Sequence, residues 1–177
     1  MKKKRLFTPG PTSVPEEILL EMAKPIMHHR TDEFRAIVKD VSNGLKYIFQ
    51  TENSVFIIGS SGTGAMETAI TNVFSKGEKI AVVCCGKFGE RFAEIGNVYG
   101  LKILPVEIEW GKTLKAEELE KLLRENPDIR GICTPLCETS TGTAFDIENY
   151  GKVISKFPDV ILIVDGVSSV GAIPCYM

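Results

Sequence analysis

A glycine- and hydroxyl-rich stretch, running from Gly59 to Gly64, lies directly before a predicted helix. Glycines allow a backbone to approach an anion closely, and the first N–H groups of a helix have no partner within it. The stretch therefore predicts a phosphate-binding turn, with a plain flexible turn as the alternative. A Walker loop would require lysine at Ala65, and a dinucleotide fingerprint that begins at Gly62 would require a small residue at Glu67. Neither of these familiar nucleotide loops is present.

Three further segments follow apolar runs that are typical of buried strands. Asp165 follows the run 160–164, where a carboxylate is costly to bury unless a cation pairs with it. By itself, Asp165 fits a metal ligand, a helix cap or a cofactor anchor. Phe88, which is flanked by glycines, fits either a ring that stacks on a planar ligand or a core phenylalanine. The loop 138–143 carries four hydroxyls, which suit a polar ligand or a plain turn.

One ligand would satisfy these segments together. It needs a phosphate for the turn at Gly62–Gly64, an aromatic face for Phe88 and a cationic nitrogen for Asp165. Pyridoxal phosphate has all three groups. A carboxylate beside its pyridine nitrogen keeps that nitrogen protonated, so that the ring can withdraw electrons from the α-carbon of a substrate. The residues favour a pyridoxal phosphate site, and a nucleotide site remains the alternative.

Hydrophobic period and turn residues predict the elements that would position these segments. Apolar runs predict strands at 55–58, 80–83, 102–106, 129–134 and 160–164. Helical spacing and capping residues predict helices at 15–24, 31–50, 65–74, 88–99, 115–126 and 146–156. Strands that alternate with helices require crossover connections, so the predicted fold class is α/β, with a mostly parallel sheet and helices on both faces. Such sheets bind ligands at the carboxyl ends of their strands.

The composition is that of a soluble globular protein. The 177 residues have a net charge of −2 and are 44% hydrophobic and 25% charged, which disfavours disorder and nucleic-acid binding. No apolar run is long enough to cross a bilayer, and the basic residues 1–5 are interpreted as a solvated tail. The five cysteines, at 84, 85, 133, 137 and 175, lack the spacing of zinc or redox sites. We expect reduced thiols in a cytoplasmic protein and no metal site.

Five segments in register carry a resemblance to a known family. They are residues 7–11 (FTPGP), 62–67 (GTGAME), 86–91 (GKFGER), 138–142 (ETSTG) and 164–169 (VDGVSS). In this order and spacing the chain resembles the class V aminotransferases of the alanine–glyoxylate and serine–glyoxylate (serine–pyruvate) group, across essentially its whole length. These are fold-type I pyridoxal phosphate enzymes, so the resemblance implies that the α/β fold is the large domain of such an enzyme.

The resemblance implies a role for each matched residue. The cofactor-binding positions would be Gly62, Thr63 and Gly64 for the phosphate, Phe88 and Val167 for the two faces of the ring, Thr139 for the ring substituents, and Asp165, as the catalytic residue, for the pyridine nitrogen. Gly10 would lie near the substrate. His29 and Arg30 would lie near the active site and a dimer interface, or would form an ordinary surface pair.

The resemblance also indicates what the chain lacks. Fold-type I enzymes hold the cofactor on a Schiff-base lysine that follows the strand-end aspartate, and no lysine follows Asp165. Without it, the chemistry loses its covalent anchor and its general base. We therefore expect the N-terminal portion of a longer enzyme, inactive by itself. Residues 1–30 would be an arm and short helix, and residues 31–177 the first part of the cofactor-binding large domain, with the remainder and a C-terminal small domain absent.

The resemblance implies transamination in the complete enzyme. An amino group would pass between a small amino acid (alanine, serine or aspartate-like) and a 2-oxo acid such as glyoxylate or pyruvate, in a cytoplasmic homodimer. Aminoethylphosphonate transaminases also open with Thr-Pro-Gly-Pro and remain an alternative, as do a nucleotide-binding doubly wound domain and a piece that serves only in assembly. Cysteine desulfurases are disfavoured, because they carry histidine at the position of Phe88.

Overall fold

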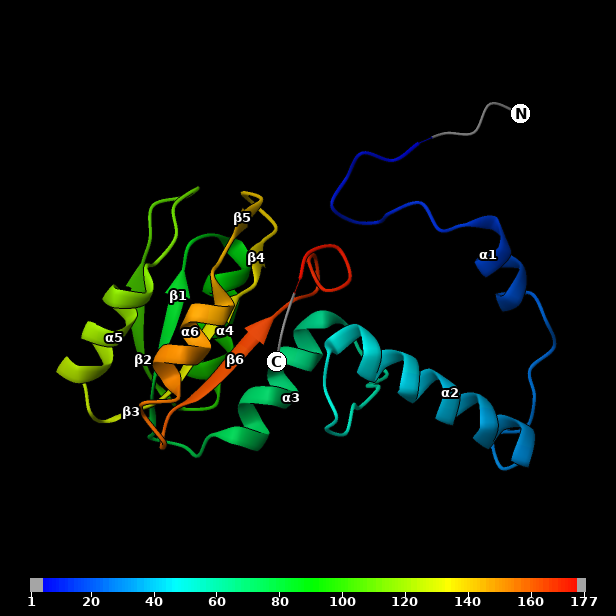
Figure 1. The fold of residues 1–177 in the computed structure, drawn as a ribbon, viewed down its shortest axis with the longest axis horizontal. Helices are drawn as coiled ribbons and strands as arrows, with labels where there is room; N and C mark the ends of the chain where they lie inside the picture. Colours follow the sequence, from blue (N-terminus) through cyan, green and yellow to red (C-terminus); the bar gives the residue numbers. More distant parts are fainter. Residues whose placement is uncertain (1–4, 175–177) are drawn as a thin grey trace. The chain divides into compact units, whose positions relative to one another are not determined.

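The computed structural model describes residues 5–174 and divides the chain into two compact units (Figure 1). One unit comprises the residues up to Ile48 together with Glu52–Val55, and the other comprises Phe49–Thr51 and the residues from Phe56 onward. Most of the basic start and Cys175 lie outside the described residues. Within the described part of the chain, no helix combines the length and the apolar character needed to cross a bilayer.

The first unit is helical. Helix α1 (Glu16–Met22) begins after Pro15, and helix α2 (Asp32–Phe49) begins after Thr31, whose Oγ1 accepts a hydrogen bond from the Phe34 amide at 3.2 Å. The predicted helices at 15–24 and 31–50 are therefore confirmed, and Thr31 caps the second. Neither helix contains a buried residue. Because this unit includes α2, it is longer than the arm expected over residues 1–30, and the domain boundaries stay a prediction.

The second unit contains a parallel sheet, as predicted, but it has four of the five expected strands. The strands are β1 (Lys79–Cys84), β2 (Lys102–Glu107), β3 (Ile129–Pro135) and β6 (Ile161–Asp165), in the order β2-β1-β3-β6. The helices are α3 (Gly62–Val73), α4 (Lys87–Val98), α5 (Ala116–Glu125) and α6 (Ile147–Ile154). A short antiparallel hairpin of β4 (Cys137–Glu138) and β5 (Thr143–Ala144) was not predicted.

Helices cover both faces of the sheet (Figure 1). The burial of the side chains on the inner strand β1 explains this arrangement. Alternate residues of a strand point to opposite faces. Ala81 and Val83 pack in the hydrophobic cluster that includes α5 and α6, whereas Ile80 and Val82 pack in the cluster that includes α3 and α4. All four side chains are at most 1% exposed. An unbroken apolar run therefore suits a strand that is buried on both sides.

The expected strand at 55–58 is wrong. The backbone there forms no strand, Phe56 is 82% exposed, and none of the strands in the described residues pairs with this run. A strand requires a neighbour for its backbone hydrogen bonds, and β-propensity alone does not supply one. Helix α3 also begins earlier than expected, at Gly62, because Ser61 caps it by accepting from the Gly64 amide at 3.4 Å.

Tyr150 gives a testable prediction about the packing of α5 and α6 against the sheet. Its side chain is fully buried, and its hydroxyl donates to the Leu114 carbonyl oxygen at 2.5 Å. Burial raises the pKa of Tyr150, so the hydroxyl remains a neutral donor. Tyr150→Phe leaves that carbonyl without its partner, and we expect a loss of about 1–2 kcal/mol in the free energy of unfolding, measured by urea denaturation. Tyr99→Phe is the control, because the Tyr99 hydroxyl donates to Glu67 at an exposed position, where water can replace the lost partner. Equal stability of the two variants would contradict the expectation.

Candidate functional site

The sheet topology brings the candidate residues to one edge. Strands β1, β3 and β6 are parallel and adjacent, so their carboxyl ends lie side by side. The chain leaves β1 toward β2 and then returns to β3 on the other side of β1, which makes the β1–β3 boundary a topological switch point. Helix α4 follows β1, the β4–β5 hairpin follows β3, and a turn at 166–170 follows β6. Ligands bind at this edge in sheets of this kind.

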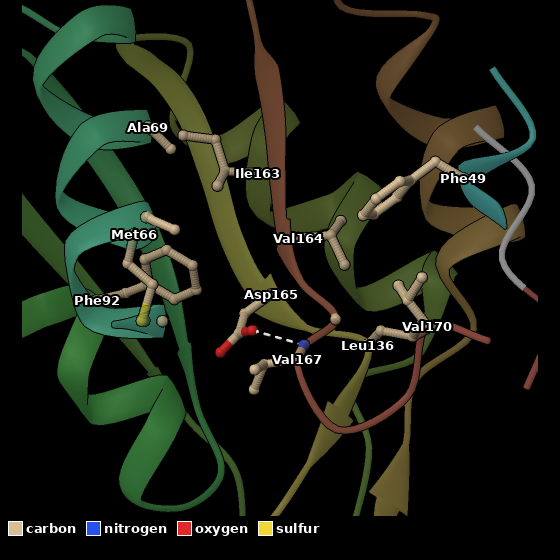
Figure 2. A pocket seen from close by; sticks show the side chains of 13 residues that line it. Phe49, Met66, Ala69, Phe92, Leu136, Ile163, Val164, Asp165, Val167 and Val170 are labelled. Carbon is tan, nitrogen blue, oxygen red and sulfur yellow. Dashed lines mark hydrogen bonds between the residues drawn. The ribbon is translucent and has the colours of Figure 1, made fainter. Parts of the chain in front are cut away.

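A cavity of about 400 Å³ lies at the end of β6 (Figure 2). Three predicted site residues line it, namely Gly62, Asp165 and Val167. Figure 2 shows the Asp165 side chain on the same side of β6 as Ile163, toward α3, whereas Val164 points to the opposite side. The remaining lining is largely apolar. A carboxylate in such a setting favours a cationic partner, because an unpaired charge is costly to remove from water.

Asp165 is held by its own turn. One carboxylate oxygen, Oδ1, accepts a hydrogen bond from the Val167 amide at 3.0 Å (Figure 2). The residue is partly buried, and within the described residues no lysine, arginine or histidine forms an ion pair with it. The carboxylate is therefore oriented but not neutralised by this part of the chain. It can accept a hydrogen bond from a protonated ring nitrogen.

The glycine-rich turn forms the first turn of α3. A Cβ atom on Gly62 would lie 3.7 Å from Val167 Cγ2, so the Gly62 backbone lies directly against the turn after β6. The first N–H groups of a helix have no intrahelical acceptor, and Gly62 and Thr63 occupy these positions. Gly64 donates to Ser61 instead. Thr63 and Gly64 do not line the cavity, although they belong to the same helix turn as Gly62.

The first turn of α4 differs from that of α3, because its donors are already bound. The Lys87 amide donates to Ser140 Oγ at 3.2 Å, and the amides of Phe88 and Gly89 donate to the Glu138 carboxylate. An anionic ligand at this edge would therefore find backbone donors on α3 and not on α4. Sequence reasoning missed Glu138. It lies in β4, beyond the end of β3 at Pro135, and opens a hydroxyl-rich loop, so its local sequence resembles that of an ordinary loop carboxylate.

Thr139 and Phe88 lie outside the cavity, and hydrogen bonds connect them to the segments around it. Thr139 Oγ1 donates to Ser168 Oγ at 2.9 Å, and Ser168 Oγ donates to the Cys137 carbonyl oxygen at 3.2 Å. The loop after β3 is therefore bonded to the turn that carries Val167. Phe88 is 38% exposed and, like Thr139, does not line the cavity. Its backbone is bonded to Glu138, the neighbour of Thr139.

The expected substrate-side residues lie in the first unit. Gly10, His29 and Arg30 are all exposed there, and the rings of His28 and His29 stack with their centroids 4.9 Å apart. The Arg30 amide donates to Nδ1 of His28 at 3.2 Å. The roles expected for Gly10, His29 and Arg30 stay predictions.

The thiols are structural. Cys84, Cys85 and Cys133 are free and buried, as expected from the apolar runs that contain them. Burial raises the pKa of Cys84 to about 11 and that of Cys85 and Cys133 to about 12. These thiols therefore stay protonated and are poor nucleophiles. The described residues contain no group of three or more histidine, cysteine or acidic side chains that could hold a metal ion.

The fold is a doubly wound α/β domain, with a helix N-terminus and a strand-end carboxylate beside one cavity. Residues 6–177 match the family model described as aminotransferase class-V, and the chain belongs to that family. The resemblance carried by the five segments, and the fold class it implied, are confirmed.

Named relatives agree with this assignment. The chain is 40% identical over 169 residues to an uncharacterized aminotransferase of Methanocaldococcus jannaschii, covering 96% of this chain and 44% of that protein. It is 35% identical over 172 residues to the L-aspartate–glyoxylate aminotransferase of Paracoccus denitrificans, covering 94% and 43%. The crystal structure of alanine–glyoxylate aminotransferase from Nostoc sp. superposes with a TM-score of 0.90 at 29% identity, covering 96% and 45%. The chain thus spans less than half the length of these relatives.

Proposed function

We propose that the protein binds pyridoxal phosphate and that the whole protein catalyses transamination between a small amino acid and a 2-oxo acid. The observation that carries the proposal is the pairing of Gly62 and Asp165 on one cavity. It places backbone donors suited to a phosphate and an oriented carboxylate suited to a protonated ring nitrogen at the same sheet edge. Family membership supports the same cofactor.

The residues present fit the proposed cofactor. The carboxylate of Asp165 has no cationic partner in the described part of the chain, and a pyridinium nitrogen would supply one. Gly62 and Thr63 would bind the phosphate with their amides, and Gly64 would allow its close approach. Val167 and Phe88 would contact the ring, and the Thr139 hydroxyl would bind a ring substituent. When bound, the cofactor withdraws electrons from the α-carbon of the substrate.

The named relatives support the substrate class. One is an L-aspartate–glyoxylate aminotransferase and another an alanine–glyoxylate aminotransferase, so we propose glyoxylate or pyruvate as the acceptor and a small amino acid as the donor. Gly10 would contact that substrate, and the whole protein would act as a homodimer. Incubation of the whole protein with each amino acid and either glyoxylate or pyruvate, followed by measurement of the glycine or alanine formed, tests this choice of donor and acceptor.

Cofactor binding gives a prediction that does not depend on turnover. Pyridoxal phosphate at about 100 times its Kd should stabilise the fold by about 2.7 kcal/mol, which raises the Tm by roughly 5–10 °C. Pyridoxal, which lacks the phosphate, should raise it less, because it forgoes the amides at the start of α3. ATP and NAD should leave it unchanged. A shift with a nucleotide and none with pyridoxal phosphate would refute the proposal and favour the nucleotide-binding alternative.

A further inference from the structure

The free backbone amides at the start of α4 are capped by side chains that lie about fifty residues later in the sequence. Glu138 accepts from the Phe88 amide at 3.2 Å and from the Gly89 amide at 3.0 Å, across sequence separations of 50 and 49 residues. Ser140 Oγ accepts from the Lys87 amide, and the next amide, of Glu90, makes the first intrahelical bond, to the Gly86 carbonyl at 3.0 Å. Every backbone donor of this helix turn therefore has an acceptor.

Glu138 is fully buried, and its surroundings suit an ionised carboxylate. Beside the two amides of α4, it accepts from the Ser140 amide at 3.1 Å and from the Ser140 hydroxyl. The thiol of Cys85 lies 3.9 Å from Oε2. Hydrogen bonds from several donors and the positive end of the α4 dipole together offset the cost of burying the charge. The carboxylate accepts from each of these donors and donates to none.

The two glycines on either side of Phe88 are packed closely against Glu138 and the sheet. A Cβ atom on Gly86 would lie 2.6 Å from the Glu138 carboxyl carbon, and one on Gly89 would lie 2.2 Å from the Val83 carbonyl oxygen. The backbone of Phe88 is thus confined between the Glu138 carboxylate on one side and strand β1 on the other. Its amide direction, and with it the origin of its side chain, depends on where that carboxylate lies.

We propose that Glu138 is a positioning residue that sets the Phe88 ring at the cofactor site. This inference rests on the proposed function, because it assigns the ring to the cofactor. Glu138 also precedes Thr139, whose hydroxyl donates to Ser168 on the turn after β6. One buried carboxylate therefore ties the turn that carries Phe88 to the loop that carries Thr139, and that loop is bonded to the turn that carries Val167.

Glu138→Gln tests the proposal with almost no change in volume. An amide group replaces one acceptor oxygen with a donor, which opposes either the amides of Phe88 and Gly89 or the amide of Ser140 and in both orientations weakens the contact between the two segments. We expect faster amide hydrogen exchange at these two residues without cofactor, about 5-fold weaker binding of pyridoxal phosphate, and a changed visible circular dichroism of the bound cofactor. Glu90→Gln is the control, because Glu90 belongs to the same turn and forms only a surface ion pair with Lys87. It should match the wild type in all three measurements.

A second variant covers the case in which Glu138→Gln does not fold. Ser140→Ala removes one donor to Glu138 and the acceptor of the Lys87 amide, so it should produce the same changes at smaller size. Faster exchange with unchanged affinity and dichroism would overturn the proposal, since Glu138 would then be merely structural. Unchanged exchange would overturn it as well. Failure of the wild type to bind pyridoxal phosphate would instead refute the proposed function, while the exchange measurement still decides whether Glu138 holds the turn.

Discussion

Replacement of Gly89 by alanine is expected to lower the free energy of unfolding by about 3 kcal/mol or more and to abolish binding of pyridoxal phosphate. The added Cβ would lie 2.2 Å from the Val83 carbonyl oxygen and 3.3 Å from Cys84 Cα. Both atoms belong to the backbone of β1, the strand between β2 and β3, so they have no free rotation by which to yield. Helix α4 must move away from the sheet, which also breaks the bond from the Gly89 amide to Glu138.

Gly151→Ala is the matched control for this prediction. Gly151 is an exposed residue inside α6, and an added Cβ would meet nothing within 4 Å. Because alanine is the better helix former, this variant should gain about 0.5–1 kcal/mol. Urea denaturation followed by circular dichroism compares the two, and a cofactor titration completes the test. If both variants were as stable as the wild type, the close approach of α4 to β1 would not exist in solution.

Replacement of Asp165 by asparagine is expected to weaken binding of pyridoxal phosphate about 50-fold and to leave the fold almost as stable as before. Asparagine keeps the oxygen that accepts from the Val167 amide, so the turn after β6 retains this bond. What disappears is the negative charge. A protonated ring nitrogen loses its ionic partner in a cavity of largely apolar lining, where a charged hydrogen bond contributes most.

Asp159→Asn removes a carboxylate that does not line the cavity and serves as the control. Its side chain is 78% exposed, and its contact with Arg130 at 3.8 Å is a surface ion pair that contributes little. We expect the wild-type affinity for pyridoxal phosphate, measured by titration and followed as the change in cofactor absorbance. Equal affinities for Asp165→Asn and Asp159→Asn would show that Asp165 does not pair with the cofactor, and the proposed function would lose its main support.

The sequence by itself determined the elements whose cause is local. The apolar runs that became β1 and β3 are recognisable because a strand buried on both faces needs apolar residues at almost every position. The runs that became β2 and β6 are less buried, and their apolar composition alone marked them. The capping residues Thr31 and Asp146 mark helix starts because each accepts from an amide three residues later. Asp165 was also predictable, because a carboxylate that directly follows an apolar strand run is recognisable from the local sequence.

Tertiary structure alone decided the features that need two distant segments. The run 55–58 has strand composition but no partner strand in the described residues, and composition does not report pairing. The role of Glu138 depends on amides about fifty residues away, so nothing near it in the sequence distinguishes a buried cap from a loop carboxylate. The cavity likewise exists only because strand order sets Gly62 beside the end of β6. Hydrophobic period is a property of neighbours along the chain, whereas burial and hydrogen-bond partners are properties of neighbours in space.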